Sequence, residues 1–489
     1  MKATKIVCTL GPASAGLSVM KEMLQAGMNV ARLNCSHGTH EEHGEKIATF
    51  RQACSEVGVP AAVLLDTKGP EIRLGTFPEE PVQMEKGAEF VLYGDPDKPG
   101  TPEGVGISWP GLAAQVSPGT RILVDDGKIR MTVEQVVGED IHCRTEEAGF
   151  VSTKKGVNVP DIHLDMDFLS QRDREDLLFG IREKVDFVAA SFVRSVEDVE
   201  DVRNFLKENG GEDIQIIAKI ENPEGIRNFD GILEVADGIM IARGDMGVEV
   251  DYATLPGIQK SFIVRCNRKG KPVITATQML ESMITEPMPT RAEITDVANA
   301  VFDGTSAVML SGESAAGKYP AQTVKVMTRI LEQAEGDLLA SPLRLPAEAY
   351  LEESGKATPP EGSETSAGVM DLSTAIGHAA GQIAEDIGAR AMIAITQSGY
   401  TARMMARFHP AQPIIAATPS AEAARQLALV RGVFPVETRS AETWDQLLEE
   451  AVAGAREAGF LSGGDRIVIS AGLPLNVSGN TNTIRVETV

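Results

Sequence analysis

Ionisable and hydroxyl side chains gather directly after short apolar segments of this chain. Six segments end in this way, and the side chains that follow them include Arg32, Asp66, Glu71, Arg73, Lys219, Glu221, Arg243, Asp245, Thr277 and Ser311. Carboxylates beside cations suggest a bound Mg²⁺ ion, which takes one or two carboxylates and otherwise water and substrate oxygens. Lys219 and Glu221 are two residues apart, so on a strand they share one face. An ammonium group and a metal ion could flank a phosphoryl group there, and phosphoryl transfer depends mainly on such positioning.

Each of these side chains also has a purely structural interpretation. A single Asp, Lys or Thr at a strand end can cap a helix or form an ion pair, but capping does not explain polar groups at six strand ends together. His37, His40 and His43 suggest a zinc site, yet three-residue steps on a helix turn by about 300° and spread the side chains apart. No Walker A pattern or dinucleotide fingerprint is present, which disfavours a P-loop or Rossmann enzyme.

Eight apolar segments of strand length would position these groups. They cover residues 5–10, 29–34, 61–66, 187–191, 215–220, 238–242, 272–275 and 306–310, and helical patterns such as 18–26 and 196–209 lie between them. Buried parallel strands that alternate with helices indicate βαβ units. Eight such strands favour a closed (β/α)₈ TIM barrel over an open doubly wound sheet. The polar residues would then converge at the carboxyl ends of the strands, where barrel active sites lie.

The remaining sequence predicts three further parts around a barrel formed by residues 1–70 and 164–336. Residues 71–163 alternate apolar and polar residues with turn signals, which predicts a small β domain, a lid, inserted into one barrel loop. Residues 337–368 are rich in Glu, Pro, Ser and Gly and predict a linker or exposed insertion. Residues 369–489 return to the βα pattern, with strands expected at 391–396, 414–418, 466–470 and 483–486, and predict a separate α/β domain.

Charge and cysteine content limit the partners and the compartment. The 489 residues include 70 acidic and 46 basic side chains, for a net charge of −24, which repels nucleic acid and anionic membranes. Five scattered cysteines without CxxC spacing argue against a disulfide framework or a zinc cage. No segment predicts a signal peptide or a membrane span. We therefore expect a cytoplasmic protein.

Six segments resemble signature segments of the pyruvate kinase family, in the same order. They are ARLNCSHG at 31–38, DTKGPEIR at 66–73, IAKIEN at 217–222, ARGD at 242–245, ATQMLESM at 276–283 and PTRAE at 289–293. The resemblance covers nearly the whole chain. It implies a barrel with a small β-barrel lid and a C-terminal α/β domain for effector binding and oligomerisation, usually in a homotetramer. The implied glycolytic reaction passes the phosphoryl group of phosphoenolpyruvate to ADP, giving pyruvate and ATP, with Mg²⁺ (or Mn²⁺) and K⁺.

The resemblance also implies a role for individual residues. Lys219 would stabilise the phosphoryl group in flight, Arg32 would contact it, and Glu221 and Asp245 would hold the divalent metal. Substrate binding would involve Arg32, Lys219, Thr277 and the backbone of Gly244 and Asp245. The K⁺ ligands would be Asn34, Ser36, Asp66 and Thr67, and the nucleotide would face Asn34, His37, Arg73 and Lys155. Thr277 and Ser311 could lie on the water path that protonates the enolate.

The resemblance further implies K⁺ dependence, because dependent members carry a glutamate at the position of Glu71. Charge balance gives a physical reason, since an unmatched Glu71 carboxylate would leave a negative site that a cation must fill. Thr67 and Lys68 agree with the dependent pattern, whereas Leu74 is more typical of the independent one.

A turn in the C-terminal domain predicts an effector site. The expected strand 391–396 leads into a turn and a helical pattern over 402–408, and the candidate phosphate ligands are Thr396, Ser398, Gly399, Thr401 and Arg403. Backbone N–H groups at a helix start favour a phosphate, and phosphorylated effectors bind here in the family. A helix simply capped by Thr401 is the alternative. Residues 471–476 lack the Trp-Arg pair of many fructose-bisphosphate-activated members, so we expect a sugar or nucleoside monophosphate.

Two other functions stay open from the sequence. One is a metal-dependent aldolase or lyase acting on an enolpyruvate, which would need neither the lid nor the K⁺ ligands. The other is a catalytically silent metabolite sensor, which the intact Lys219, Glu221 and Asp245 disfavour.

Overall fold

The eight predicted barrel strands close into a parallel barrel. The computed structural model describes residues 2–489 except 161, 341–348, 350–370, 441–442 and 474–479. The strands are neighbours in the order β1-β17-β16-β15-β14-β13-β3-β2. Their bounds are β1 Lys5–Thr9, β2 Val30–Asn34, β3 Ala62–Asp66, β13 Phe187–Ala190, β14 Gln215–Ile220, β15 Gly238–Ala242, β16 Val273–Ala276 and β17 Ala307–Leu310. Each strand begins and ends within one residue of its prediction, and the predicted fold is confirmed.

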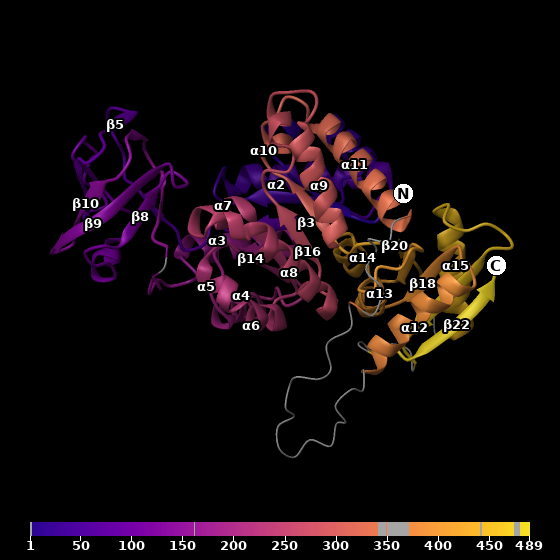
Figure 1. Cartoon of the computed structure of the whole chain (residues 1–489). Coiled ribbons are helices and arrows are strands. Elements are labelled where there is room, and N and C mark those ends of the chain that lie inside the picture. Colours follow the sequence, from indigo (N-terminus) through magenta and orange to yellow (C-terminus); the bar gives the residue numbers. More distant parts are fainter. Residues whose placement is uncertain (1, 161, 341–348, 350–370, 441–442, 474–479) are drawn as a thin grey trace, which may run out of the picture.

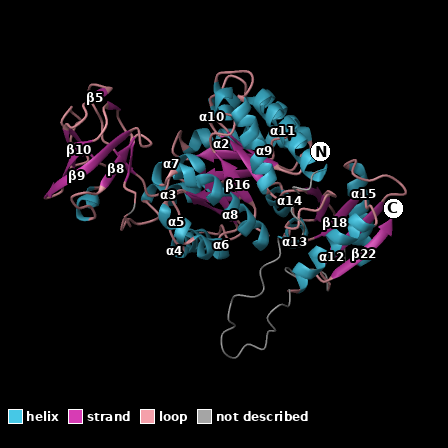
Figure 2. Cartoon of the chain, in the orientation of Figure 1, coloured by secondary structure: helices cyan, strands magenta, loops and turns pink. Residues whose placement is uncertain are grey.

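Helices surround this barrel (Figure 2). They are α1 Leu17–Ala26, α2 His40–Val57, α3 Gln171–Arg182, α4 Val196–Glu208, α5 Pro223–Arg227, α6 Phe229–Val235, α7 Arg243–Glu249, α8 Leu255–Lys269, α9 Arg291–Asp303, α10 Gly312–Ala315 and α11 Pro320–Ala340. Capping boxes begin α2, α3 and α9, where Thr39, Ser170 and Thr290 exchange hydrogen bonds with an acidic residue three positions later. These reciprocal bonds satisfy backbone N–H groups that a helix start leaves without partners.

The barrel core has two layers. One layer fills the inside of the barrel with strand side chains, including Val7, Leu64, Phe187 and Met240. The other layer packs the outer faces of the strands against the surrounding helices. Successive strand residues point to opposite faces, so strands buried on both sides are continuously apolar, which is the pattern visible in the sequence.

The segment between β3 and α3 forms a separate β structure, the lid. Its strands are β4 Ile72–Arg73, β5 Val82–Met84, β6 Glu89–Tyr93, β7 Gly104–Gly106, β8 Arg121–Val124, β9 Ile129–Val137, β10 Asp140–Thr145, β11 Gly149–Val151 and β12 Gly156–Asn158. Seven of them make one mostly antiparallel sheet in the order β4-β12-β8-β9-β10-β6-β7, and β11 pairs with β5. An isolated bridge between Leu74 and Ile107 links the two ends of the larger sheet. The lid has a hydrophobic core of its own and stands away from the barrel (Figure 1).

The C-terminal domain is an α/β sheet in the order β20-β19-β18-β21-β22. Its elements are α12 Leu372–Asp386, β18 Ala391–Ile395, α13 Tyr400–Ala406, β19 Ile414–Thr418, α14 Ala421–Leu427, β20 Val433–Glu437, α15 Trp444–Glu457, β21 Arg466–Ala471 and β22 Thr483–Thr488. The sequence analysis did not predict β20, which contains Pro435. This strand lies at an edge of the sheet, where a proline is tolerated. The predicted linker 337–368 lies outside the described residues, apart from 349 and residues 337–340, which still belong to α11.

The C-terminal domain packs against the barrel at the amino ends of the strands. Lys5 Nζ donates to the Val433 carbonyl oxygen and lies 4.5 Å from the Phe434 ring centroid. Asp186 forms an ion pair of 2.7 Å with Arg425. In Figure 1 this domain and the lid lie on opposite sides of the barrel. No helix among the described residues is long and apolar enough to cross a membrane.

The buried ammonium of Lys5 predicts a pH-dependent stability. Burial, followed by the charge of Lys2, lowers the pKa of Lys5 to about 7, whereas an unfolded lysine titrates near pH 10.4. Between about pH 7 and pH 10 the unfolded chain therefore binds more protons, and stability rises with pH by about 1.4 kcal/mol per unit. Thermal unfolding of the wild type and Lys5→Met should be measured at pH 7, 8 and 9. The stability of the wild type relative to the variant should increase with pH. Parallel pH profiles would contradict this.

Candidate active site

Two residues predicted to contact the phosphoryl group, Arg32 and Lys219, meet the predicted K⁺ ligand Asp66 at the carboxyl ends of the barrel strands. Asp66 ends β3, Arg32 lies on β2 and Lys219 lies on β14. Arg32 Nε is 2.7 Å from Asp66 Oδ2, and Lys219 Nζ is 3.0 Å from Asp66 Oδ1. Arg32 Nη1 also donates to Thr9 Oγ1 at 2.9 Å. All three charged side chains are at most 9% exposed, so a desolvated cluster with two positive charges and one negative charge faces the mouth of the barrel.

The carboxylates keep Lys219 protonated despite its burial. Burial alone would lower the pKa of Lys219, but Asp66 and Glu221 outweigh it, and the pKa lies above its ordinary value. Burial would likewise raise the pKa of Asp66, which Arg32 and Lys219 hold below its usual range. The Lys219 ammonium and the Asp66 carboxylate are therefore both charged at neutral pH. A protonated ammonium is the form that can stabilise a phosphoryl group.

Glu221 has the environment of a metal ligand. Its Oε1 is buried, lies 3.0 Å from Lys219 Nζ and forms no hydrogen bond with any described residue. Burial raises the pKa of Glu221 to about 7, and the nearby Asp245 acts in the same direction. Two adjacent carboxylates that disfavour each other's charge suit a divalent cation. Groups of three or more His, Cys, Asp or Glu side chains that could hold a metal do not occur in the described part of the chain, so water and substrate would complete the coordination.

The loops after β15 and β16 hold each other in place. Thr277 has a φ of 69°, in the left-handed region, and its Oγ1 accepts a hydrogen bond from the Gly244 N–H at 2.8 Å. Arg243 donates to the Thr277 carbonyl oxygen at 2.7 Å and pairs with Asp296 at 2.8 Å. Arg243 was expected to be one of the cations in the mouth of the barrel, but these contacts give it a structural role. The Gly244 and Thr277 groups predicted to seat a carboxylate are bonded to each other.

Ser311, predicted to lie on the water path, follows β17. Its Oγ is buried and has no hydrogen-bond partner among the described residues. A buried hydroxyl without a protein partner is the kind of group that an ordered water satisfies. The position therefore suits a water molecule, as the predicted proton path requires.

A cleft of about 510 Å³ separates the lid from the barrel. His37, Arg73 and Lys155, which were predicted to face the nucleotide, all line it, and so does the metal-ligand candidate Asp245. Lys155 pairs with Asp125 of the lid at 2.8 Å. Asn34, the fourth nucleotide candidate, is not among the lining residues. Its Oδ1 accepts from the Ser36 N–H at 3.1 Å.

The charge-balance reason for K⁺ dependence is wrong. Both Glu71 carboxylate oxygens accept from Arg73, at 2.6 and 2.7 Å, and Lys68 pairs with the same carboxylate at 2.9 Å. Glu71 therefore leaves no unmatched charge. K⁺ binding by Asp66 and Thr67 stays a prediction. Asp66 Oδ1 and the Thr67 carbonyl oxygen both lie within hydrogen-bond distance of Ser191 Oγ.

Known proteins match this chain along its whole length. A family model described as pyruvate kinase, barrel domain, matches residues 1–324, and one described as pyruvate kinase, alpha/beta domain, matches residues 374–487. The chain belongs to the pyruvate kinase family. The pyruvate kinase of Clostridium acetobutylicum is 44% identical over 491 residues, covering all of both chains. Those of Geobacillus stearothermophilus and Staphylococcus epidermidis are 44% and 45% identical over all of this chain and 80% and 81% of theirs. Membership makes the protein a phosphotransferase.

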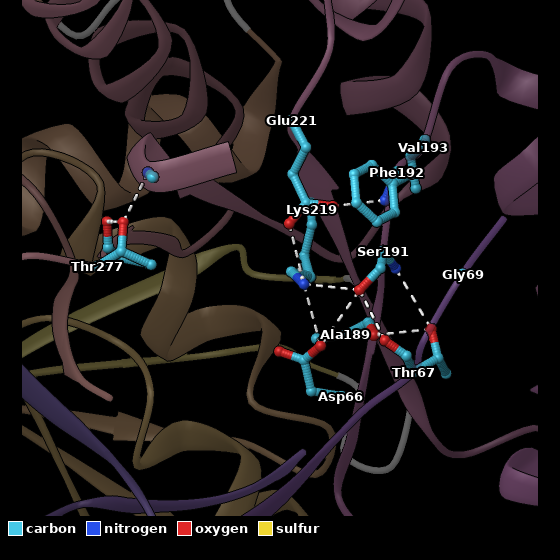
Figure 3. Close-up of polar contacts among 12 residues, drawn as sticks. Asp66, Thr67, Gly69, Ala189, Ser191, Phe192, Val193, Lys219, Glu221 and Thr277 are labelled. Carbon is cyan, nitrogen blue, oxygen red and sulfur yellow. Dashed lines mark hydrogen bonds and ion pairs between the residues drawn. The ribbon is translucent and has the colours of Figure 1, made fainter. Parts of the chain in front are cut away.

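Sequence reasoning missed two hydroxyl residues of this pyruvate kinase site. Ser191, directly after β13, contacts Lys219, Asp66 and Thr67 (Figure 3). Thr9, at the end of β1, accepts from Arg32. Neither carries a charge, so neither stands out beside Lys219 or Asp66. The barrel rule could have found both, because residues at the carboxyl ends of all eight strands face the same site.

Most of the residues predicted to bind the effector phosphate contact each other or other residues of the C-terminal domain. Gly399, with a φ of 79°, precedes α13, so Thr401 is not the helix cap that the alternative interpretation expected. The Thr401 hydroxyl bonds with Thr481 at 2.8 Å, and Arg403 donates to the Ser398 carbonyl at 3.1 Å. Thr396 is buried. Phosphate binding by these residues stays a prediction, and residues 474–476 of the segment that lacks the Trp-Arg pair lie outside the described residues.

Proposed function

We propose that this protein is a glycolytic pyruvate kinase that transfers the phosphoryl group of phosphoenolpyruvate to ADP, giving pyruvate and ATP. The observation that carries the proposal is the buried contact of Lys219 with both Asp66 and Glu221. Asp245 connects this cluster to the cleft under the lid. It lines the cleft and contributes to the raised pKa of Glu221. A charged phosphoryl group and a nucleotide would thus meet at one place.

The chain's own residues have separable parts in this reaction. The Arg32 guanidinium and the Lys219 ammonium would contact the phosphoryl group. Their positive charges would stabilise its negative charge during transfer. Thr277 would orient the carboxylate of phosphoenolpyruvate, with the Gly244 N–H released from its hydroxyl. Arg73 and Lys155 would bind the nucleotide phosphates from the lid side of the cleft, and a water beside Ser311 would protonate the enolate.

Two kinds of cation would assist these residues. Glu221 and Asp245 would hold Mg²⁺ or Mn²⁺, which when bound neutralises phosphate charge and polarises the phosphoryl oxygens. Asn34, Ser36, Asp66 and Thr67 would supply the oxygen ligands of K⁺. We also propose a lid of residues 71–163, a phosphorylated effector in the C-terminal domain, a homotetrameric assembly and a cytoplasmic location.

A coupled assay for ADP-dependent pyruvate formation tests the proposal. Purified protein with phosphoenolpyruvate, ADP, Mg²⁺ and K⁺ should form pyruvate and ATP in equal amounts. An aldolase or lyase would form product without ADP, and a silent sensor would form none. Either result would refute the proposed transfer.

Potassium activation is a separate expectation. If K⁺ completes the site at Asp66 and Thr67, activity in KCl should exceed activity in tetramethylammonium chloride by at least about tenfold, within the range of coupling between linked sites. Tetramethylammonium keeps the ionic strength equal but is too bulky for an oxygen-lined ion site. Equal rates in the two salts, at saturating Mg²⁺ and substrates, would contradict the K⁺ site.

A further inference from the structure

Ser191 lies at the centre of the hydrogen bonds around Lys219 (Figure 3). Its Oγ is 2.6 Å from Lys219 Nζ, 2.7 Å from the Thr67 carbonyl oxygen and 3.2 Å from Asp66 Oδ1. The residue is only 2% exposed. It therefore touches both the ammonium proposed to stabilise the phosphoryl group and two oxygens proposed to bind a monovalent cation.

Lys219 Nζ donates hydrogen bonds to Asp66 and Ser191 and forms an ion pair with Glu221. An ammonium group has three N–H donors and no acceptor. Three oxygens lie within 3.0 Å of Nζ, one each from Asp66, Ser191 and Glu221. A phosphoryl oxygen that approaches the ammonium competes with these three oxygens for its donors and its charge.

The single hydroxyl hydrogen of Ser191 has two possible acceptors. Lys219 donates to Ser191 Oγ, so that hydrogen must point elsewhere. The Thr67 carbonyl oxygen, at 2.7 Å, is closer than Asp66 Oδ1, at 3.2 Å. Ser191 therefore accepts from Lys219 while it donates to the peptide oxygen of the proposed cation site.

We propose that Ser191 is a positioning residue that couples cation binding at Asp66 and Thr67 to the Lys219 ammonium. The inference rests on the proposed function. A cation at the Thr67 carbonyl oxygen repels the hydroxyl hydrogen, so the hydroxyl has to rotate about its Cβ–Oγ bond. Its lone pairs then turn relative to Lys219 Nζ, and the lysine shifts its donors toward the phosphoryl group. Cation occupancy and phosphoenolpyruvate binding thereby become linked through one side chain.

Calorimetric titration of phosphoenolpyruvate without ADP measures this coupling apart from turnover. With Mg²⁺ present, the dissociation constant is compared in KCl and in tetramethylammonium chloride. The wild type should bind about tenfold more tightly in KCl, a typical strength of coupling between two sites. Ser191→Ala should bind with nearly the same affinity in both salts, and Ser191→Thr, which retains the hydroxyl, should keep most of the difference.

Two further variants make the comparison decisive. Ser195→Ala removes a nearby serine that caps α4 and lies outside the site, so it should lower stability and leave the coupling unchanged. Ser191→Cys preserves the size of the side chain but bonds weakly. It should behave like Ser191→Ala and replaces it if the alanine variant fails to fold.

The outcomes separate this inference from the proposed function. Undiminished coupling in Ser191→Ala or Ser191→Cys overturns the role of Ser191, as does a loss of coupling in Ser191→Thr equal to that in Ser191→Ala. A wild type that forms pyruvate but binds phosphoenolpyruvate equally in both salts overturns the coupling and leaves phosphoryl transfer intact. A wild type without ADP-dependent pyruvate formation refutes the proposed function itself.

Discussion

Lys219→Met should remove about 3–4 kcal/mol of transition-state stabilisation and lower kcat accordingly. This is the effect of removing a single charge-stabilising donor. The ammonium is buried against Asp66 and Glu221. Solvent therefore cannot compensate for the lost positive charge. An interaction that strengthens during transfer changes kcat more than substrate affinity. Steady-state kinetics with varied phosphoenolpyruvate should therefore show a low kcat and a KM within a few-fold of the wild type.

Lys269→Met is the matched control for this variant. Lys269 lies near the end of α8 and pairs with Glu234, outside the mouth of the barrel. The same chemical change there should leave kcat unaltered. A Lys219→Met enzyme with nearly wild-type kcat would remove the ammonium from the mechanism. The substitution removes one of the two cations paired with the buried Asp66 carboxylate, which lowers stability. Circular dichroism should therefore first verify that the variant is folded.

Replacing residues 71–163 with a short Gly/Ser linker should abolish phosphoryl transfer and leave a folded barrel. The lid contributes Arg73 and Lys155 to the cleft, and its closure would exclude water from a charge-dense site. We expect the rate to fall by at least about 100-fold, the effect of one lost charge-stabilising donor. The barrel should survive, because the lid core and the barrel core are separate hydrophobic clusters.

The double variant Arg73→Met and Lys155→Met is the corresponding control. It keeps the lid and removes the two cations proposed to bind the nucleotide. If the lid acts through these charges, the double variant should lose most of the activity that the deletion loses. Retained kinase activity in a monodisperse deletion variant would show that the lid is not required.

The barrel could be predicted because its strands are buried on both faces. The segment 238–242 is apolar throughout and 215–220 is mostly apolar, and both are strands with those bounds. The strand-end rule then brought Arg32, Asp66 and Lys219 together correctly. These residues were recognisable from their charge alone, because an ionised side chain after a buried strand requires a partner or a ligand.

Other features depend on contacts that spacing does not reveal. Glu71 lies only two residues from Arg73, but whether they pair depends on the short strand β4, so the sequence alone did not exclude an unmatched charge. Arg243 also follows a strand, yet its guanidinium donates to the carbonyl oxygens of Ala276, at the end of β16, and Thr277. Ser191 escaped notice because a serine after a strand is more often a cap than a bridge between charged groups.

The backbone of Thr277 points to a conflict between stability and activity at this position. A residue with a branched Cβ is rarely found at positive φ, and holding it there costs about 1–3 kcal/mol. Glycine or asparagine would relieve that cost, but neither carries a hydroxyl that can accept from the Gly244 N–H. Screening a library for heat resistance alone should therefore enrich glycine or asparagine at position 277, whereas screening for turnover should retain threonine. Such opposed preferences at one residue are characteristic of sites where function has been favoured over stability.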